Sequence, residues 1–205
     1  MAPKKDLGAI LLRGNHEQMT LNFMDQNDPL WLFNGGYATL KQLLGNVSLK
    51  SARDQFKTTS REHFYHDFFN IMPLTYQTTY QTNEMIFVHA AYPLYPQMTV
   101  DPLWSTGLYW YVPGTKVFAH NTTNKTIVCG HTPTFLIRGS LTADDFYQNP
   151  RTTTDSGPLI VRYPGEKALF TDGWCHFVAS NRTGNIIAFD ENGNIIQTIT
   201  SNTTF

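Results

Sequence analysis

Three short apolar runs in this 205-residue chain each lead into side chains that can bind a metal. Residues 8–12 lead into Asn15 and His16, residues 84–88 into His89, and residues 126–129 into His131. Short apolar runs bounded by turn residues predict buried strands. In an open sheet with helical layers, ligands gather at the carboxyl ends of the strands. The sequence therefore predicts an α/β fold in which three strand ends converge on one polar site.

The rest of the chain alternates between helical and extended patterns. The expected helices are residues 17–24, 37–44 and 48–72, with turns at Asp28-Pro29 and at residues 34–36. The further expected strands are residues 74–80, 159–162, 167–171, 175–179, 185–189 and 194–198. This order is typical of a mixed sheet with helices outside it.

Composition excludes several classes of partner. Charged residues make up only 15% of the chain and the net charge is −1, so nothing attracts nucleic acid or an anionic membrane by bulk charge. No apolar stretch approaches the ~18 residues that a membrane span needs. The two cysteines are too few for a disulfide scaffold, which predicts a reduced, cytoplasmic protein.

The polar residues at the strand ends suit a divalent metal. Neutral imidazole is the commonest metal ligand, and an Asn carbonyl suits a harder ion such as manganese, iron or zinc. Asn15, His89 and His131 would give three ligands of one ion. His16, next to a ligand, would face the site without binding the metal, as a general acid does. Glu17 would either orient His16 or cap the following helix.

Several segments resemble the serine/threonine phosphoprotein phosphatases, which are calcineurin-like metallophosphoesterases. Residues 11–17 read Leu-Leu-Arg-Gly-Asn-His-Glu, residues 87–90 read Phe-Val-His-Ala, and residues 130–133 read Gly-His-Thr-Pro. These match three signature segments of that family in order and spacing. Residues 31–39, with Trp31, Asn34, Gly35, Gly36 and Thr39, resemble a segment of bacterial diadenosine tetraphosphate hydrolases and related small protein phosphatases.

The resemblance implies an enzyme that hydrolyses phosphate esters with two divalent ions, manganese being the expected metal. It makes Asn15, His89 and His131 the ligands of the second ion and His16 the general acid. The implied substrate is phosphoserine or phosphothreonine on a protein, with a dinucleoside polyphosphate as the alternative. The implied fold is a calcineurin-like β-sandwich flanked by helices.

Two departures from the family pattern bear on this expectation. The family begins with G-D-x-H and G-D-x-x-D-R-G segments, which hold the first metal and bind phosphate, whereas only ten residues precede Leu11 here. We therefore expect residues 1–205 to form a single partial domain that lacks the first βαβα portion. The residues present would account for one of the family's two metal ions. The family's arginine after Leu-Trp is also missing after Trp104. A catalytically inactive remnant that binds a partner is the alternative to an enzyme.

The sequence also gives expectations for five further residues. Arg13, Gly14 and Gly130 belong to the signature segments, and Arg13 is expected as a buried ion-pair partner more than as a phosphate ligand. Cys129 is expected as a small buried hydrophobe. Asp172 ends a strand, and it would lie either near the metals or in a turn before Gly173.

Overall fold

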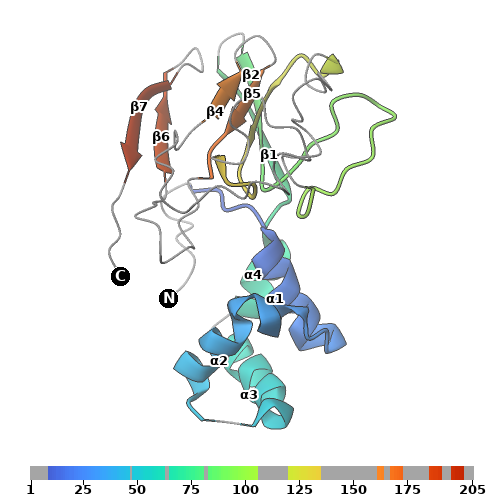
Figure 1. Cartoon of the computed structure of the whole chain (residues 1–205), viewed down its shortest axis with the longest axis vertical. Coiled ribbons are helices and arrows are strands. Elements are labelled where there is room, and N and C mark those ends of the chain that lie inside the picture. Colours follow the sequence, from blue (N-terminus) through green and yellow to red (C-terminus); the bar gives the residue numbers. More distant parts are fainter. Residues whose placement is uncertain are drawn as a thin grey trace, which may run out of the picture. The chain divides into compact units, whose positions relative to one another are not determined.

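The structure is a computed structural model that forms two compact units, residues 1–74 and residues 75–205 (Figure 1). The residues that it describes are 9–46, 48–62, 65–80, 83–105, 120–134, 161–163, 167–172, 185–190 and 195–200. Each unit has its own buried core. The expectation of a single partial domain remains a prediction.

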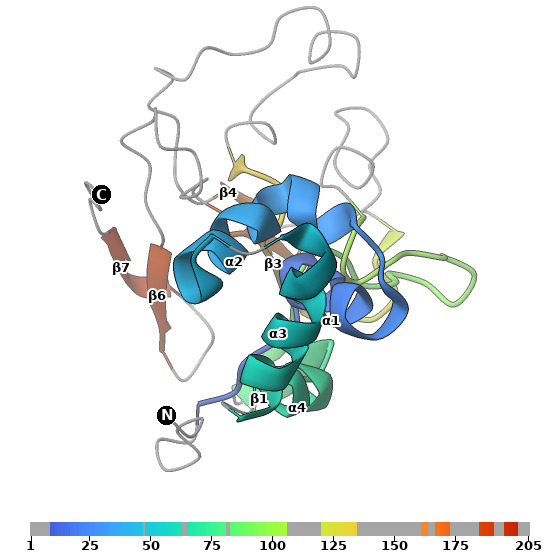
Figure 2. The same ribbon diagram turned by 90° about the horizontal axis from the view of Figure 1, so that it is seen from below.

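The first unit is helical. Its elements are α1 (Asn15–Gln26), a kinked π-helical segment η2 (Leu32–Gly36), α2 (Tyr37–Leu44), α3 (Leu49–Glu62) and α4 (Tyr65–Ile71). Figure 2 shows α2 and α3 as neighbours. The predicted helices at residues 17–24 and 37–44 are confirmed, the second ending at Leu44 with Gly45 as its C-cap. The predicted helical stretch at residues 48–72 is divided between two helices, α3 and α4.

Trp31 is the centre of the first unit's core. Its ring stacks on Phe56 of α3 with a centroid distance of 5.0 Å and lies 5.3 Å from the ring of Phe23 of α1. Gly35 has a φ of 93°, which favours glycine. A Cβ on Gly36 would lie 2.3 Å from the Trp31 ring. Gly35 therefore permits the kink in the backbone, and Gly36 permits the backbone to approach the indole ring closely.

Cationic side chains hold the ends of two helices in this unit. Arg13 donates to the carbonyl oxygens of Asn70 and Met72, at 2.6 and 3.2 Å, where α4 ends. Arg53 of α3 donates to the carbonyls of Phe23 and Met24 near the end of α1. The last carbonyls of a helix have no intrahelical donor, and cations there also interact favourably with the helix dipole. The acceptors of Arg13 are neutral, unlike the carboxylate of the expected ion pair.

The predicted strand at residues 8–12 is wrong for the part that the structure describes. Residues 9–14 form no strand there, and the side chains of Ile10 and Leu11 are 47% and 51% exposed. The backbone N–H of Arg13 donates instead to the carbonyl of Pro73. A strand needs a neighbouring strand for its backbone groups, and none of the described strands pairs with this run.

The second unit contains a mixed five-stranded sheet. Its strands are β1 (Thr75–Tyr80), β2 (Asn83–Val88), β3 (Thr126–Cys129), β4 (Val161–Tyr163) and β5 (Ala168–Phe170). The order is β1-β2-β3-β5-β4, with the three inner strands β2, β3 and β5 parallel and the two outer strands antiparallel to their neighbours. The three parallel strands therefore end at the same edge of the sheet.

Both faces of the inner strands are covered by apolar side chains. On one face, Ile86, Ile127 and Phe170 pack against the segment after β2, where Leu94 is fully buried. On the other face, Met85, Val128 and Leu169 meet Phe189 of β6 (Asn185–Phe189) and Ile195 of β7 (Ile195–Thr200). The β6–β7 hairpin thus covers the second face of the sheet (Figure 1). Parallel strands need such cover on both sides.

The predicted α/β class is confirmed by this combination of helices and a mixed sheet. The strands at residues 84–88, 126–129, 167–171 and 185–189 all occur within one residue of their predicted bounds. The predicted strand at residues 175–179 lies outside the described residues. Within the described ranges, every helix is too short or too polar to span a bilayer.

Substitution of Gly36 by alanine should destabilise the first unit. The new methyl would overlap the Trp31 ring at 2.3 Å, and overpacking of this kind costs roughly 1–3 kcal/mol. We expect a lower urea midpoint, monitored by far-UV circular dichroism. Ala38→Ser, at an exposed position of α2, is the matched control and should lower the midpoint much less, because the change in helix propensity is below about 0.7 kcal/mol. An unchanged midpoint for Gly36→Ala would contradict the described packing of Trp31.

The stability of the first unit should also depend on pH through His66 of α4. His66 Nε2 lies 3.0 Å from an Asp25 carboxylate oxygen, and its Nδ1 lies 3.2 Å from Asp67. The hydrogen bond to Asp25 raises the pKa of His66 above 6.5, against the opposing effect of burial. Burial raises the pKa of Asp25, but hydrogen bonds from His66 and Lys57 outweigh it and leave that pKa below 3.8.

The raised pKa means that His66 stabilises the folded state fully below pH 6.5 and loses this effect as pH rises through the raised value. The lowered pKa of Asp25 means that its contribution is present above pH 3.8 and is lost as pH falls through the lowered value. The difference in unfolding free energy between the unsubstituted chain and His66→Gln should therefore be largest between these limits. It should shrink at neutral and alkaline pH.

Candidate functional site

The parallel strands β2 and β3 bring His89 and His131 together. Val88 and Cys129 are register partners at the ends of these strands, and His89 follows the first directly. The ladder continues for one more bond, from the N–H of Gly130 to the carbonyl of His89 at 2.9 Å. His131 comes next, with a φ of 62°. This left-handed conformation is uncommon for residues other than glycine, and it turns the chain sharply at the strand end.

The two imidazole rings face each other through their nitrogens. His89 Nε2 and His131 Nδ1 lie 3.1 Å apart, and the ring centroids are separated by 4.9 Å with an angle of 60° between the planes. Both side chains are partly buried. Two predicted site residues that are 42 positions apart in the sequence are therefore brought into contact.

This pair fits a divalent metal ion. Nitrogens that bind one ion at ~2.1 Å lie about 3.0 Å apart in octahedral geometry and about 3.4 Å apart in tetrahedral geometry. The observed separation of 3.1 Å falls within that interval. An ion bound by both nitrogens would take the place of the hydrogen bond between the two rings.

Other ligands would have to join the pair. Among the described residues, no three His, Cys, Asp or Glu side chains are grouped closely enough to hold an ion. Asp172 follows β5 at the same sheet edge, and its carbonyl accepts from the N–H of Thr134 at 2.8 Å. The carboxylate of Asp172 does not form a group of three potential metal ligands with His89 and His131. A further ligand must be of another type or come from another part of the chain.

Asn15 and His16 begin α1 in the first unit. Asn15 is buried, whereas His16 is exposed. Glu17 accepts a hydrogen bond from the N–H of Gly14 at 2.9 Å, so its carboxylate caps α1. Of the two roles expected for Glu17, the structure shows the capping one. The rigid helix start fixes the backbone of His16 while leaving its ring accessible.

A cavity of about 480 Å³ opens beside His16 within the first unit. Its apolar walls come from α2, α3, α4 and the residue before η2: Trp31, Leu43, Phe56, Tyr65 and Phe69. The polar lining is contributed by His16, Glu17, Thr20, Asn34 and Thr39. Apolar walls with a few polar groups are typical of ligand pockets of this size.

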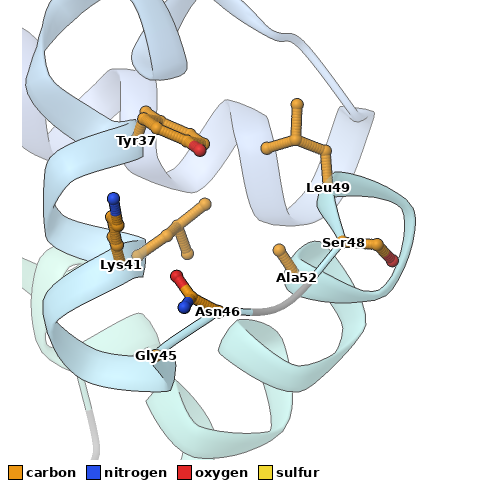
Figure 3. A pocket seen from close by; sticks show the side chains of 8 residues that line it. Tyr37, Lys41, Gly45, Asn46, Ser48, Leu49 and Ala52 are labelled. Carbon is orange, nitrogen blue, oxygen red and sulfur yellow. The ribbon is translucent and has the colours of Figure 1, made fainter.

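A second, smaller pocket of about 280 Å³ lies between α2 and α3 (Figure 3). Tyr37 of α2 and Leu49 of α3 stand on opposite walls, with Ala52 below them. Its polar groups come from Lys41, Asn46 and Ser48, with the hydroxyl of Tyr37. Neither histidine nor carboxylate lines it, so it offers no acid–base pair of its own.

Cys129 ends β3 next to Gly130 and is fully buried. Burial raises the pKa of its thiol to about 12. A thiol with this pKa is not a nucleophile near neutral pH. The expectation that Cys129 is a small buried hydrophobe is confirmed.

The cavity beside His16 was not predicted from the sequence. Its walls come from several helices, and the expected role of the aromatic residues in helices is core packing. A signal was nevertheless present, because the Trp31, Asn34, Gly35 and Thr39 pattern contributes four of its lining residues. In the sequence, that pattern indicated a family resemblance and did not predict a cavity.

Comparison with models of protein families gives a match that covers most of the chain. The family model described as calcineurin-like phosphoesterase matches residues 1–165. This match covers most of the chain, including the segments that contain Asn15, His89 and His131. A comparison with curated proteins gives no match.

Proposed function

Because the chain belongs to the calcineurin-like phosphoesterase family, we propose that it is a metal-dependent phosphatase acting on phosphoserine or phosphothreonine in proteins. The observation that supports this best is the 3.1 Å approach of His89 Nε2 and His131 Nδ1 at the ends of parallel strands. The seven-residue segment at residues 11–17 supports the serine/threonine phosphatase type within the family.

His89 and His131 would hold one divalent ion, and the carbonyl oxygen of Asn15 would be its third ligand from this chain. Two nitrogens and an amide oxygen suit manganese, with iron or zinc as the alternatives. When bound, the ion supplies Lewis-acid stabilisation of the phosphoryl oxygens and activation of water. The sheet contributes by keeping the two nitrogens at the required separation.

His16 would protonate the alkoxide that leaves from phosphorus. Serine and threonine alkoxides are poor leaving groups, so a proton donor at the leaving oxygen contributes strongly, typically 10²–10⁴-fold. The imidazole is exposed at the start of α1 and therefore accessible to a substrate. Arg13 would not contact phosphate, because its guanidinium donates to Gln18, Asn70 and Met72.

The partner would be a phosphorylated protein in the cytoplasm. The net charge of −1 favours neither nucleic acid nor an anionic membrane. The buried thiol of Cys129 is compatible with a reducing compartment.

Removal of either imidazole should weaken manganese binding. Loss of a residue that merely orients a ligand costs 10–100-fold in metal affinity, so His89→Gln and His131→Gln should each cost at least ~10-fold. The measurement is calorimetric titration of the full chain with Mn²⁺, with Zn²⁺ and Fe²⁺ as parallel titrations. His120→Gln is the matched control and should bind like the unsubstituted chain. Equal metal affinity in all four proteins would contradict the proposed ligand pair.

Substitution of His16 should affect substrates according to their leaving group. His16→Ala should lower kcat for a phosphoserine peptide by roughly 10²-fold or more, because the alkoxide then leaves unprotonated. The loss should be much smaller for p-nitrophenyl phosphate, whose leaving group needs little protonation. The measurement is manganese-dependent phosphate release from both substrates, with His120→Ala as the control. Manganese binding without release of phosphate from either substrate would instead favour the inactive remnant.

A further inference from the structure

We infer that the cavity beside His16 is a substrate subsite that binds an uncharged aromatic side chain next to the phosphorylated residue. The inference rests on the proposed function, because His16 both lines the cavity and protonates the leaving oxygen there. A group bound in the cavity would therefore lie close to the scissile bond. It would determine which phosphoproteins the chain prefers.

The walls favour a ring. The accessible apolar surface comes mainly from Phe69, Leu43 and Tyr65, the last two being 52% and 44% exposed. Trp31 and Phe56 also line the cavity but are only 5% and 4% exposed. Aromatic pairs gain about 0.5–1.5 kcal/mol beyond the burial of their area. A volume of about 480 Å³ is sufficient for one aromatic side chain.

The polar groups of the lining already make hydrogen bonds within the protein. The hydroxyl of Thr20 donates to the carbonyl of His16, the amide of Asn34 to that of Leu30, and the hydroxyl of Thr39 to that of Gly35. The carboxylate of Glu17 accepts from Gly14. Each bond uses one donor or acceptor of its group, so an apolar ring can enter the cavity without leaving these groups unpaired. An apolar ring requires nothing from them.

Charge argues against a nucleotide. None of the residues that line the cavity is Lys or Arg. A dinucleoside polyphosphate would bring several phosphates to the mouth of the cavity, and bound phosphates are usually contacted by cations. A peptide brings a single phosphate. Consecutive residues of an extended peptide are spaced by about 3.5 Å, so a neighbouring side chain can reach a cavity that His16 lines.

The test compares phosphoserine peptides with phenylalanine or alanine on either side of the phosphoserine. We expect kcat/KM to be at least tenfold higher for a phenylalanine peptide, as burial of an aromatic side chain predicts. Thr39→Phe, which fills the cavity, should abolish the preference. Ala38→Phe, at the exposed neighbouring position of α2, should retain it. Hydrolysis of all peptides at one rate would overturn the subsite while leaving the proposed function intact.

A second readout does not require turnover. A peptide with 4-fluorophenylalanine in place of phenylalanine should show broadening of its ¹⁹F resonance when the metal-free chain is added, and Thr39→Phe should remove the broadening. If Thr39→Phe fails to fold, Leu43→Glu on the exposed rim replaces it, with Gln42→Glu as control. Broadening without hydrolysis would uphold the subsite and remove the proposed function. No broadening and no preference would overturn the subsite.

Discussion

The candidate metal site depends on the parallel pairing of β2 with β3. The register of Val88 with Cys129 places His89 and Gly130 side by side beyond the last paired residues, and one more backbone bond joins them. A slip of one residue would turn every side chain of the moved strand to the opposite face. The register is secured because Ile86 and Ile127 pack into one core and Met85 and Val128 into the other. The 3.1 Å approach of the two imidazoles is therefore a product of core packing on both faces.

The sheet was predictable because its signals are local. Gly130 follows the strand at residues 126–129, and Gly184 precedes the hairpin strand at residues 185–189. A turn residue therefore marks one end of each strand. The helix at residues 37–44 ends at Gly45, whose φ of 71° explains why glycine stands there. That His89 and His131 would meet was also predictable, because parallel strands end at one edge of a sheet. Their direct contact also depends on β2 and β3 being neighbours in the sheet and on the left-handed turn at His131, which the strand bounds do not specify.

The predictions that were wrong, and the cavity that was not predicted, depend on contacts between segments that are far apart in the sequence. A short sequence pattern does not specify such contacts. The apolar run at residues 8–12 resembles a buried strand, yet Ile10 and Leu11 are about half exposed and no described strand pairs with it. Arg13 was expected beside a carboxylate, but it donates to carbonyls at the end of α4, 57 and 59 residues away. The cavity beside His16 needs α1, α2, α3 and α4 together with the kink at Gly35. Contacts between distant segments therefore decide the structure at these positions, whatever conformation the short sequence pattern favours.

The two units divide the proposed chemistry between them. The sheet unit supplies the imidazole pair, whose spacing is set by strand register and which tolerates little variation. The helical unit contains His16, the proposed proton donor, and the cavity, whose rim includes the exposed residues Leu43 of α2 and Tyr65 of α4. Substitutions at these positions would alter substrate preference without disturbing β2 or β3. The exposed rim of the proposed subsite can therefore vary more freely than the proposed metal ligands. Core packing constrains Trp31 and Phe56 inside the cavity and both faces of the sheet below the two histidines.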